Sequence, residues 1–422
     1  MDDRPVPRPR APMLRGVGVA LVVVVLVGVL VRSPATVPLN PTVGPLPTGP
    51  FLTGPAADPS PADPTEEATR ESLTGQRGGL WTTIGTRAPI DLLRLGPGVW
   101  SGRELLVGFT PAVAAYTPDR RSSEAWRSLP PHPAGALQVR GAMQLPGGPV
   151  VVYGQKTCAG CLWEAALFAL DPDTGAWERL ADAPGEVSQD REVALGVGGQ
   201  VVVVRHRGAE GIQVLAYDPD ADSWRDLQAP DLGPLRWQAV AAGDQVVVVG
   251  VIVAADGTAI PLAMAHDPGT GAWRDVAAGM PLPNPHETTA VWTGQEVLLF
   301  GGSVRDGAPR GAALSLADDT WTTLPDLPLG DQLLPTLGGE GPLTGLLGVW
   351  DGEGALFVGG LIVPLFLAWT PDLATWEVRR ATTSRAGGTA VWTGRQLLLW
   401  GGTDRRGPVV DLQAWPVRPF GR

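Results

Sequence analysis

One fourteen-residue segment occurs twice in this chain, as TAVWTGQEVLLFGG at 289–302 and as TAVWTGRQLLLWGG at 389–402. Ten of the fourteen positions are identical. A chain with many copies of one short unit folds as a repeat structure, because each unit must bury its apolar surface against its neighbours. The apolar half of the segment recurs seven times, roughly 48 residues apart, as ELLVGF (104–109), PVVVYG (149–154), QVVVVRH (200–206), QVVVVGV (245–251), EVLLFGG (296–302), ALFVGG (355–360) and QLLLWGG (396–402).

Each recurrence predicts a short strand, because a continuous run of Val and Leu is typical of a strand buried on both faces. After each of the first six runs comes an Asp-rich turn and then a tryptophan, as in DPDTGAW. Asp-Pro and Asp-Gly pairs favour a tight hairpin turn, so the tryptophan opens the next strand. These tryptophans are Trp126, Trp177, Trp224, Trp273, Trp321 and Trp376.

Each unit therefore predicts four strands: the TAVW stretch, the apolar run, the segment before the Asp turn, and the strand with the tryptophan. Four-stranded units at this period are typical of propeller blades. The seventh unit lacks its last strand, whereas GLWTTIG, with Trp81, precedes the first unit. We expect an all-β, seven-bladed β-propeller over 80–419 that an amino-terminal strand closes, with the repeated tryptophans packed between blades.

The pattern resembles the kelch-repeat family. A double glycine follows the apolar run at Gly301–Gly302, Gly359–Gly360 and Gly401–Gly402; single glycines stand at Gly154 and Gly250, and the third unit has none. The aromatic residue that precedes the tryptophan by seven positions is present as Tyr217 and Trp369, and His266 fills that place in the fourth unit. The resemblance implies four-stranded kelch-like blades but no particular activity, since kelch propellers include both binding modules and enzymes.

The amino-terminal residues differ from the repeats. Residues 16–31 are uncharged and mostly apolar, arginines precede them, and after Arg32 no basic residue occurs before Arg70. This asymmetry favours a single transmembrane helix with residues 1–15 in the cytoplasm and the rest outside the cell. A cleaved signal peptide is the alternative. Residues 32–79, rich in Pro and Gly, predict a disordered linker that separates the propeller from the membrane.

The composition bears on partners and cofactors. The formal net charge of −11 argues against a nucleic-acid binder, which would show a basic footprint. The four histidines do not cluster, and no metalloprotease, phosphate-loop or serine-hydrolase motif is present. A resemblance to the galactose oxidase propeller would imply copper held by Tyr and His ligands, with a Tyr–Cys crosslink, but both cysteines lie in one turn. We therefore expect no metal and no cofactor, and a monomer.

Cys158 and Cys161 are the chain's two cysteines, in the sequence KTCAGCLW. A redox dithiol or half of a zinc site would fit a CxxC motif, but zinc needs two further ligands and no second CxxC is present. In an exported domain, a local disulfide between the two is the prediction.

A basic residue precedes the first strand in six of the seven units. This set predicts a ring of positive charge around one mouth of the propeller channel, where arginine would pair with carboxylate or phosphate groups of an anionic ligand. Loop arginines that are solvated or paired with acids are the alternative. The six residues are Arg94, Arg140, Arg191, Arg236, His286 and Arg385.

Two classes of function remain open from the sequence. The favoured one is a membrane-tethered, extracytoplasmic binding module without catalysis, whose ligand is an acidic peptide or a uronate- or phosphate-bearing cell-surface polymer. The other is an extracytoplasmic carbohydrate-active enzyme, a hydrolase, lyase or oxidase, that works at the channel mouth. A pair of carboxylates near the starts of the first strands, about 5–10 Å apart, would favour the enzyme.

Overall fold

The chain divides into two compact units, 1–71 and 72–422, and every residue described below belongs to the second. No helix among the described residues is long and apolar enough to cross a membrane, and the predicted anchor and linker lie outside them. The computed structural model describes residues 82–84, 88–89, 97–118, 120, 124–135, 137–156, 164–187, 191–268, 270–302, 310–328, 343, 345–360, 365–380, 385–404 and 406–415.

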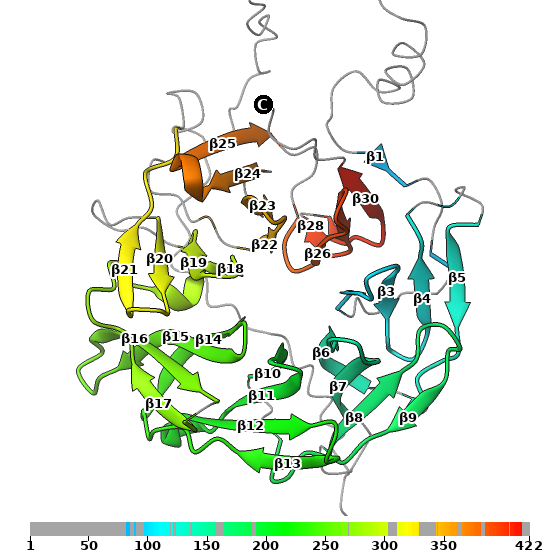
Figure 1. Cartoon of the computed structure of the whole chain (residues 1–422), viewed down its shortest axis with the longest axis horizontal. Coiled ribbons are helices and arrows are strands. Elements are labelled where there is room, and N and C mark those ends of the chain that lie inside the picture. The colour runs from blue at the N-terminus through cyan, green and yellow to red at the C-terminus, as the bar shows by residue number, and fades with distance from the viewer. Residues whose placement is uncertain are drawn as a thin grey trace, which may run out of the picture. The chain divides into compact units, whose positions relative to one another are not determined.

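Seven four-stranded antiparallel sheets follow one another around a common axis and form the predicted propeller (Figure 1). In each blade the first strand lies nearest the axis and the last lies at the rim. Blade 1 contains β2 (Val99–Trp100), β3 (Leu105–Gly108), β4 (Val113–Tyr116) and β5 (Trp126–Leu129). Blade 2 contains β6 (Leu137–Gln144), β7 (Val150–Lys156), β8 (Glu164–Leu170) and β9 (Trp177–Arg179). Blade 3 contains β10 (Glu192–Val197), β11 (Gln200–His206), β12 (Ile212–Asp218) and β13 (Ser223–Asp226).

The remaining blades repeat the same order. Blade 4 contains β14 (Leu235–Ala242), β15 (Gln245–Val253), β16 (Ala259–Asp267) and β17 (Ala272–Asp275). Blade 5 contains β18 (Thr289–Trp292), β19 (Glu296–Phe300), β20 (Gly311–Ser315) and β21 (Thr320–Thr323). Blade 6 contains β22 (Leu346–Trp350), β23 (Ala355–Gly359), β24 (Leu365–Thr370) and β25 (Thr375–Arg380). Blade 7 contains β26 (Thr389–Trp392), β27 (Leu397–Trp400), β30 (Leu412–Trp415) and β1 (Thr82–Thr83).

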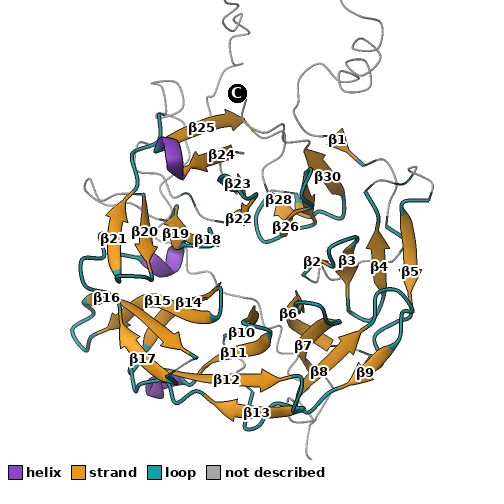
Figure 2. Cartoon of the chain, in the orientation of Figure 1, coloured by secondary structure: helices purple, strands orange, loops and turns teal. Residues whose placement is uncertain are grey.

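Other regular structure is sparse in the described residues (Figure 2). A small ribbon of β28 (Thr403–Asp404) and β29 (Gly407–Pro408) extends from blade 7, and three short 3₁₀ helices, η1 (Gly208–Glu210), η2 (Pro285–Glu287) and η3 (Pro371–Leu373), lie in connections. Of these, η2 leads directly into the inner strand of blade 5.

The amino-terminal strand closes the ring, as the sequence predicted. β1 is the outermost strand of blade 7, where Thr82 pairs with Ala414 and Thr83 with Gln413 of β30. Trp81 itself lies outside the described residues. The first and last parts of the repeat region therefore share one sheet, which leaves no open edge between blades 7 and 1.

The core lies between neighbouring blades. The apolar second strands are buried along their length, and each hydrophobic cluster joins two blades; one, for example, combines Val202 and Val204 of blade 3 with Trp237 of blade 4. Five of the repeated tryptophans also join blades, because their indole N–H groups donate to carbonyl oxygens of the preceding blade. These bonds run from Trp177 to Pro130 (3.1 Å), Trp224 to Ala181 (2.8 Å), Trp273 to Leu227 (2.8 Å), Trp321 to Val276 (2.7 Å) and Trp376 to Pro325 (2.9 Å).

The threonine that opens each TAVW copy joins inner strands. Thr289 Oγ1 donates to the carbonyl oxygen of Leu346 in the next blade at 2.8 Å. In blade 7, Thr389 Oγ1 accepts from the backbone N–H of Gly98 in blade 1 at 2.7 Å. The repeated segment thus contains a threonine that hydrogen-bonds to a neighbouring blade, the buried second strand, and the glycine turn.

Candidate functional site

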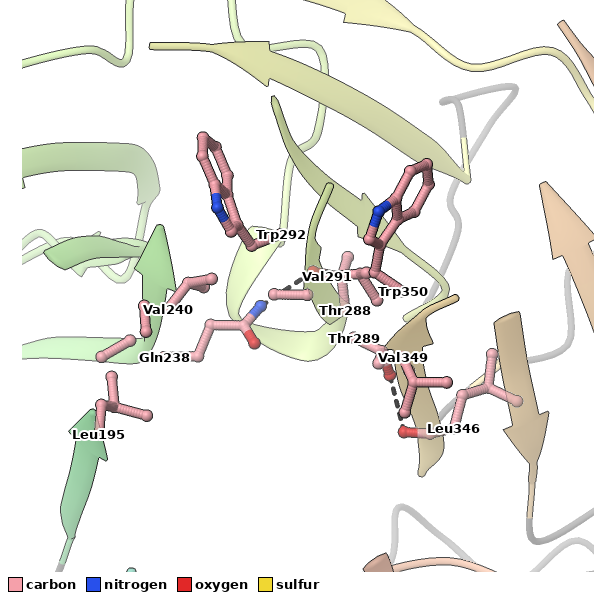
Figure 3. Close-up of a pocket in the computed structure, with 14 residues that line it drawn as sticks. Leu195, Gln238, Val240, Thr288, Thr289, Val291, Trp292, Leu346, Val349 and Trp350 are labelled. Atoms are coloured by element: carbon pink, nitrogen blue, oxygen red, sulfur yellow. Dashed lines mark hydrogen bonds between the residues drawn. The ribbon is translucent and has the colours of Figure 1, made fainter. Parts of the chain in front are cut away.

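A pocket of about 460 Å³ lies against the inner strands of blades 3 to 6 (Figure 3). Its lining consists of Leu195 and Leu346 with residues 238–241, 288–292 and 348–350. These residues belong to the first strands of four successive blades, or directly precede one. The pocket is therefore a part of the propeller's central channel.

The polar side chains in the wall bind one another. Gln238 Nε2 donates to the carbonyl oxygen of Pro285 at 2.6 Å and to Thr288 Oγ1 at 2.9 Å. Trp292 and Trp350 stand at the other end of their strands, with both indoles on the same side of the pocket (Figure 3). The lining thus combines apolar side chains with the polar side chains of Gln238, Thr288 and Thr289, and none of the lining residues is charged.

Three basic side chains gather at the start of the pocket's strands. Arg236 lies two residues before Gln238, and His286 lies two residues before Thr288. Burial lowers the pKa of His286; Glu287, whose carboxylate lies 3.9 Å from Nε2, opposes this, and the positive charges of Arg236 and Arg191 lower the pKa further. Arg191 and His286 lie just before the inner strands of blades 3 and 5, and Arg236 lies at the start of the inner strand of blade 4; we call these three residues the basic mouth.

Arg191 is held at the basic mouth by an aromatic ring. Its Cζ lies 5.0 Å from the ring centroid of Trp237, which is 1% exposed, whereas Arg191 itself is exposed. A guanidinium over an indole face is attracted by the ring's quadrupole. The indole of Trp237 thus holds the positive charge of Arg191 in a fixed position.

The other predicted ring residues lie elsewhere. Arg140 is the extra residue of a β-bulge in β6, and its guanidinium donates to Gln155 Oε1 at 3.1 Å. Arg385 is 1% exposed and binds Asp411 at 2.6 Å and the carbonyl oxygen of Gly401 at 3.1 Å, so it is a structural residue of blade 7. Arg94 lies outside the described residues. Arg385 is therefore part of the packing of blade 7, whereas Arg191, Arg236 and His286 lie at or just before the starts of the inner strands of blades 3, 4 and 5.

A buried ionic network lies between blades 2 and 3. Arg205 Nε donates to Glu192 at 2.6 Å, and both side chains are 0% exposed. The Glu192 carboxylate also accepts from Tyr153 Oη and Gln155 Nε2, and Arg205 binds Tyr153 Oη at 2.9 Å. Burial and the adjacent Glu192 raise the pKa of Tyr153. Gln155 links this network to Arg140 at the inner strand.

The network occupies a place where the repeat normally has glycine. Gly250 and Gly301 stand where Arg205 stands in blade 3, and a Cβ on them would lie 2.1 Å from the carbonyl oxygen of Arg236 and 2.6 Å from that of Leu343. Real Cβ atoms do not approach so closely. Blade 3 therefore departs from the repeat in its backbone as well as in its sequence.

Carboxylates near the pocket are the groups that acid–base chemistry there would need. The described carboxylates near the starts of the first strands at the pocket include Glu192 and Glu287. Glu192 is fully buried and bonded to Arg205, so it cannot reach a substrate. Within the described ranges no three His, Cys, Asp or Glu side chains are grouped as metal ligands.

The other titratable residues singled out in the sequence are structural or lie outside the description. His132 packs against Phe168 and Trp177, with ring centroids 4.4 and 4.8 Å away, and burial lowers its pKa to about 4. His266 pairs with Trp273 across β16 and β17 and fills the aromatic place of the repeat, as expected. Cys158 and Cys161 lie outside the described residues.

Sequence reasoning did not use the tryptophans that end the inner strands. In blades 5, 6, 7 and 1 the residue before the first hairpin turn is tryptophan, whereas blades 2 to 4 have Gln144, Gly196 and Ala241 there. The sequence signal is a tryptophan directly before the turn, in WTG, WDG and WSG. The four residues are Trp292, Trp350, Trp392 and Trp100.

Comparisons with known proteins add little beyond the fold. No family model matches the chain, and no curated protein matches it. Among solved structures, one titled "Structure of YjhT" is 14% identical, with a TM-score of 0.44, over 78% of this chain and 96% of that chain. A likeness this distant supports no inference about activity, and the seven-bladed assignment rests on the strand pairing.

Proposed function

We propose that this protein is a non-enzymatic binding module whose channel pocket takes an anionic ligand at the basic mouth. The observation that carries the proposal is that Arg191, Arg236 and His286 lie at or just before the starts of inner strands that line the pocket, in a chain with a formal net charge of −11. Arginine pairs bidentately with carboxylate and phosphate, and a low-dielectric opening concentrates its potential.

Two further features belong to the proposal. The blades are of the kelch type, which is supported by double glycines whose φ is positive, such as Gly301 (102°) and Gly302 (77°). The chain is held at the outer face of the cell membrane through residues 16–31, which is supported by their apolar composition and the arginines before them.

Binding to a panel of polyanions tests the proposal. The panel contains polygalacturonate, a glycerol phosphate polymer and poly-glutamate, each titrated into the full-length protein at two salt concentrations. We expect at least one to bind, with an affinity that falls as salt rises. The double variant Arg191→Ala/Arg236→Ala should lose about tenfold or more, since a charged hydrogen bond contributes ~1.5–3 kcal/mol.

Two variants calibrate the result. Arg225→Ala removes an exposed arginine of the outer strand β13, whose guanidinium binds Gln200 at 3.1 Å, and should leave binding unchanged. Arg140→Ala, added to the double variant, tests whether the bulge arginine of blade 2 contributes. If no polyanion binds the wild type, or if the double variant binds as well as Arg225→Ala, the basic mouth is only a solvated rim.

A further inference from the structure

We propose that the ligand is an extended acidic peptide segment, which adds as a strand to the channel-facing edge of β18 and places carboxylates at the basic mouth. This inference rests on the proposed function and specifies the chemical class of its ligand. It follows from the hydrogen-bonding register of the inner strands, which leaves one edge of each without a strand partner in the described part of the chain.

The register identifies which backbone groups of β18 face the channel. The N–H of Thr293 donates to the carbonyl oxygen of Glu296 at 3.0 Å, so these residues form a hydrogen-bonded pair. Such pairs alternate along an antiparallel ladder. Val291, opposite Leu298, is therefore hydrogen-bonded to β19, whereas the N–H and C=O groups of Ala290 and Trp292 point away from β19, toward the channel.

Blade 6 repeats the arrangement and provides a check on it. The N–H of Asp351 donates to the carbonyl oxygen of Gly354 at 3.1 Å, which turns the backbone groups of Trp350, Gly348 and Leu346 away from β23. The carbonyl oxygen of Leu346 does accept a hydrogen bond from the neighbouring blade, from Thr289 Oγ1. The alternation read from the turn is thus confirmed by an independent contact.

The channel-facing edge matches a peptide in its chemistry and spacing. It offers one donor and one acceptor every second residue, about 6.8 Å apart, which is the repeat of an extended chain. The edge carries no proline, bulge or charged side chain between Thr289 and Trp292, features that usually prevent strand addition. A peptide strand satisfies these groups through its own backbone and gains affinity without a particular side-chain sequence.

The basic mouth determines where the acidic residues of the peptide lie. The length of the pocket wall determines how many residues the peptide has. From Arg236 to Ala241, β14 extends about 17 Å at ~3.4 Å per residue. A peptide of about five residues therefore reaches from the basic mouth to the tryptophan end of the pocket. Its acidic residues lie beside Arg191 and Arg236, and its small or apolar residues lie along the wall.

Backbone N-methylation of a probe peptide tests the inference without altering the protein. The probe is acetyl-Val-Ala-Val-Ala-Asp with a free terminal carboxylate, titrated into the full-length protein, and each amide is methylated in turn. We expect a two-residue period: methylation at one set of alternate positions weakens binding about fivefold or more, as expected for a lost hydrogen bond. Methylation at the intervening positions changes binding less than about twofold.

A protein variant provides the reciprocal test. Ala290→Pro removes a channel-facing N–H that β19 does not use, and proline is tolerated where the N–H is outside the ladder. It should weaken the peptide as N-methylation does, whereas Arg225→Ala on the outer strand β13 should not. Should the variant fail to fold, the methylation series still decides the question.

The outcomes separate the two proposals. If neither the peptide nor any polyanion binds, the proposed function is wrong. If polygalacturonate binds through Arg191 and Arg236 but the peptide does not, the ligand is a uronate polymer and the peptide inference is overturned. If the peptide binds but methylation weakens binding without a two-residue period, strand addition is overturned. The proposal that the basic mouth binds anions is then unaffected.

Discussion

Two blade interfaces of this propeller are built from opposite chemistry. Between blades 2 and 3, a fully buried Arg205–Glu192 pair is surrounded by hydrogen bonds from Tyr153 and Gln155. Between blades 5 and 6, the rings of Phe300, Phe357 and Trp376 pack together, with Phe300 4.4 Å from Trp376. The same repeat accommodates both, because each interface needs only to fill the space between two sheets.

The two interfaces differ in how well they tolerate substitutions. An aromatic interface is stabilised by buried area and ring contacts, which tolerate small changes in shape. A buried ion pair must recover a large desolvation cost through good geometry, so it fails when either partner is lost. The polar interface also binds Gln155 and, through it, Arg140 of the inner strand β6, a link that the aromatic interface lacks.

The largest loss of stability is expected when one partner of the buried Arg205–Glu192 pair is removed. Arg205→Met leaves Glu192 buried without its partner, which should lower the free energy of unfolding by about 3–5 kcal/mol. Adding Glu192→Leu should recover most of this loss, because the double variant buries no charge. Urea denaturation measures both; a double variant less stable than Arg205→Met would show that the pair is not coupled as described.

The interface between blades 1 and 2 differs from the other two because its contribution to stability should depend on pH. His132, between blades 1 and 2, has a pKa of about 4, below its ordinary value of 6.5. The folded state therefore disfavours protonation, and stability present above pH 6.5 is lost as the pH falls toward 4, by up to ~3 kcal/mol. His132→Gln should show a smaller loss between pH 7 and 4 in thermal denaturation. Equal losses would place the pH dependence elsewhere.

The aromatic interface should respond more weakly and without pH dependence. Phe300→Leu keeps an apolar side chain but loses the ring contacts to Phe357 and Trp376, which should cost about 1–2 kcal/mol. The loss should be the same at pH 5 and pH 8, since no titratable group belongs to this cluster among the described residues. A pH-dependent loss would mean that the interface contains a charge that the contacts do not show.

The smallest effect is expected at an exposed ion pair. Arg179 binds Asp182 at 2.5 Å, with 52% and 44% of the two side chains exposed. Solvent screens such a pair, so Arg179→Ala should change stability by no more than about 0.5 kcal/mol. A change as large as that of Arg205→Met would remove the distinction between buried and exposed pairs on which the comparison depends.

The sequence predicted the architecture because each blade carries its own local signals. Valine runs such as QVVVVGV, Asp turns before Trp273, and the GLWTTIG strand near the start each specify a strand or turn without distant information. Whether an arginine is solvated or buried is different, since it depends on side chains from other strands, in the same blade or in the next one. Arg205 is buried because Tyr153 and Glu192 meet it there, and Arg385 because Asp411 does.

The site was only partly predictable for the same reason. The alignment of Arg191, Arg236 and His286 at or before the starts of their strands was visible in the sequence, and their membership of a common ligand site stays a prediction. The strand-end tryptophans and the bulge at Arg140 became visible only with the register, since both depend on where one strand pairs with the next.

Anion capture at the basic mouth is tested most directly at Trp237, whose ring lies beneath Arg191. The full-length protein is labelled with 5-fluorotryptophan, the Trp237 and Trp321 resonances are assigned with Trp→Phe variants, and the three polyanions are added in turn. We predict that at least one shifts the ¹⁹F resonance of Trp237 at low salt, that high salt reverses the shift, and that Trp321 on the outer strand does not move. A Trp237 resonance that no polyanion shifts, or that shifts equally in Arg191→Ala/Arg236→Ala, would contradict the account.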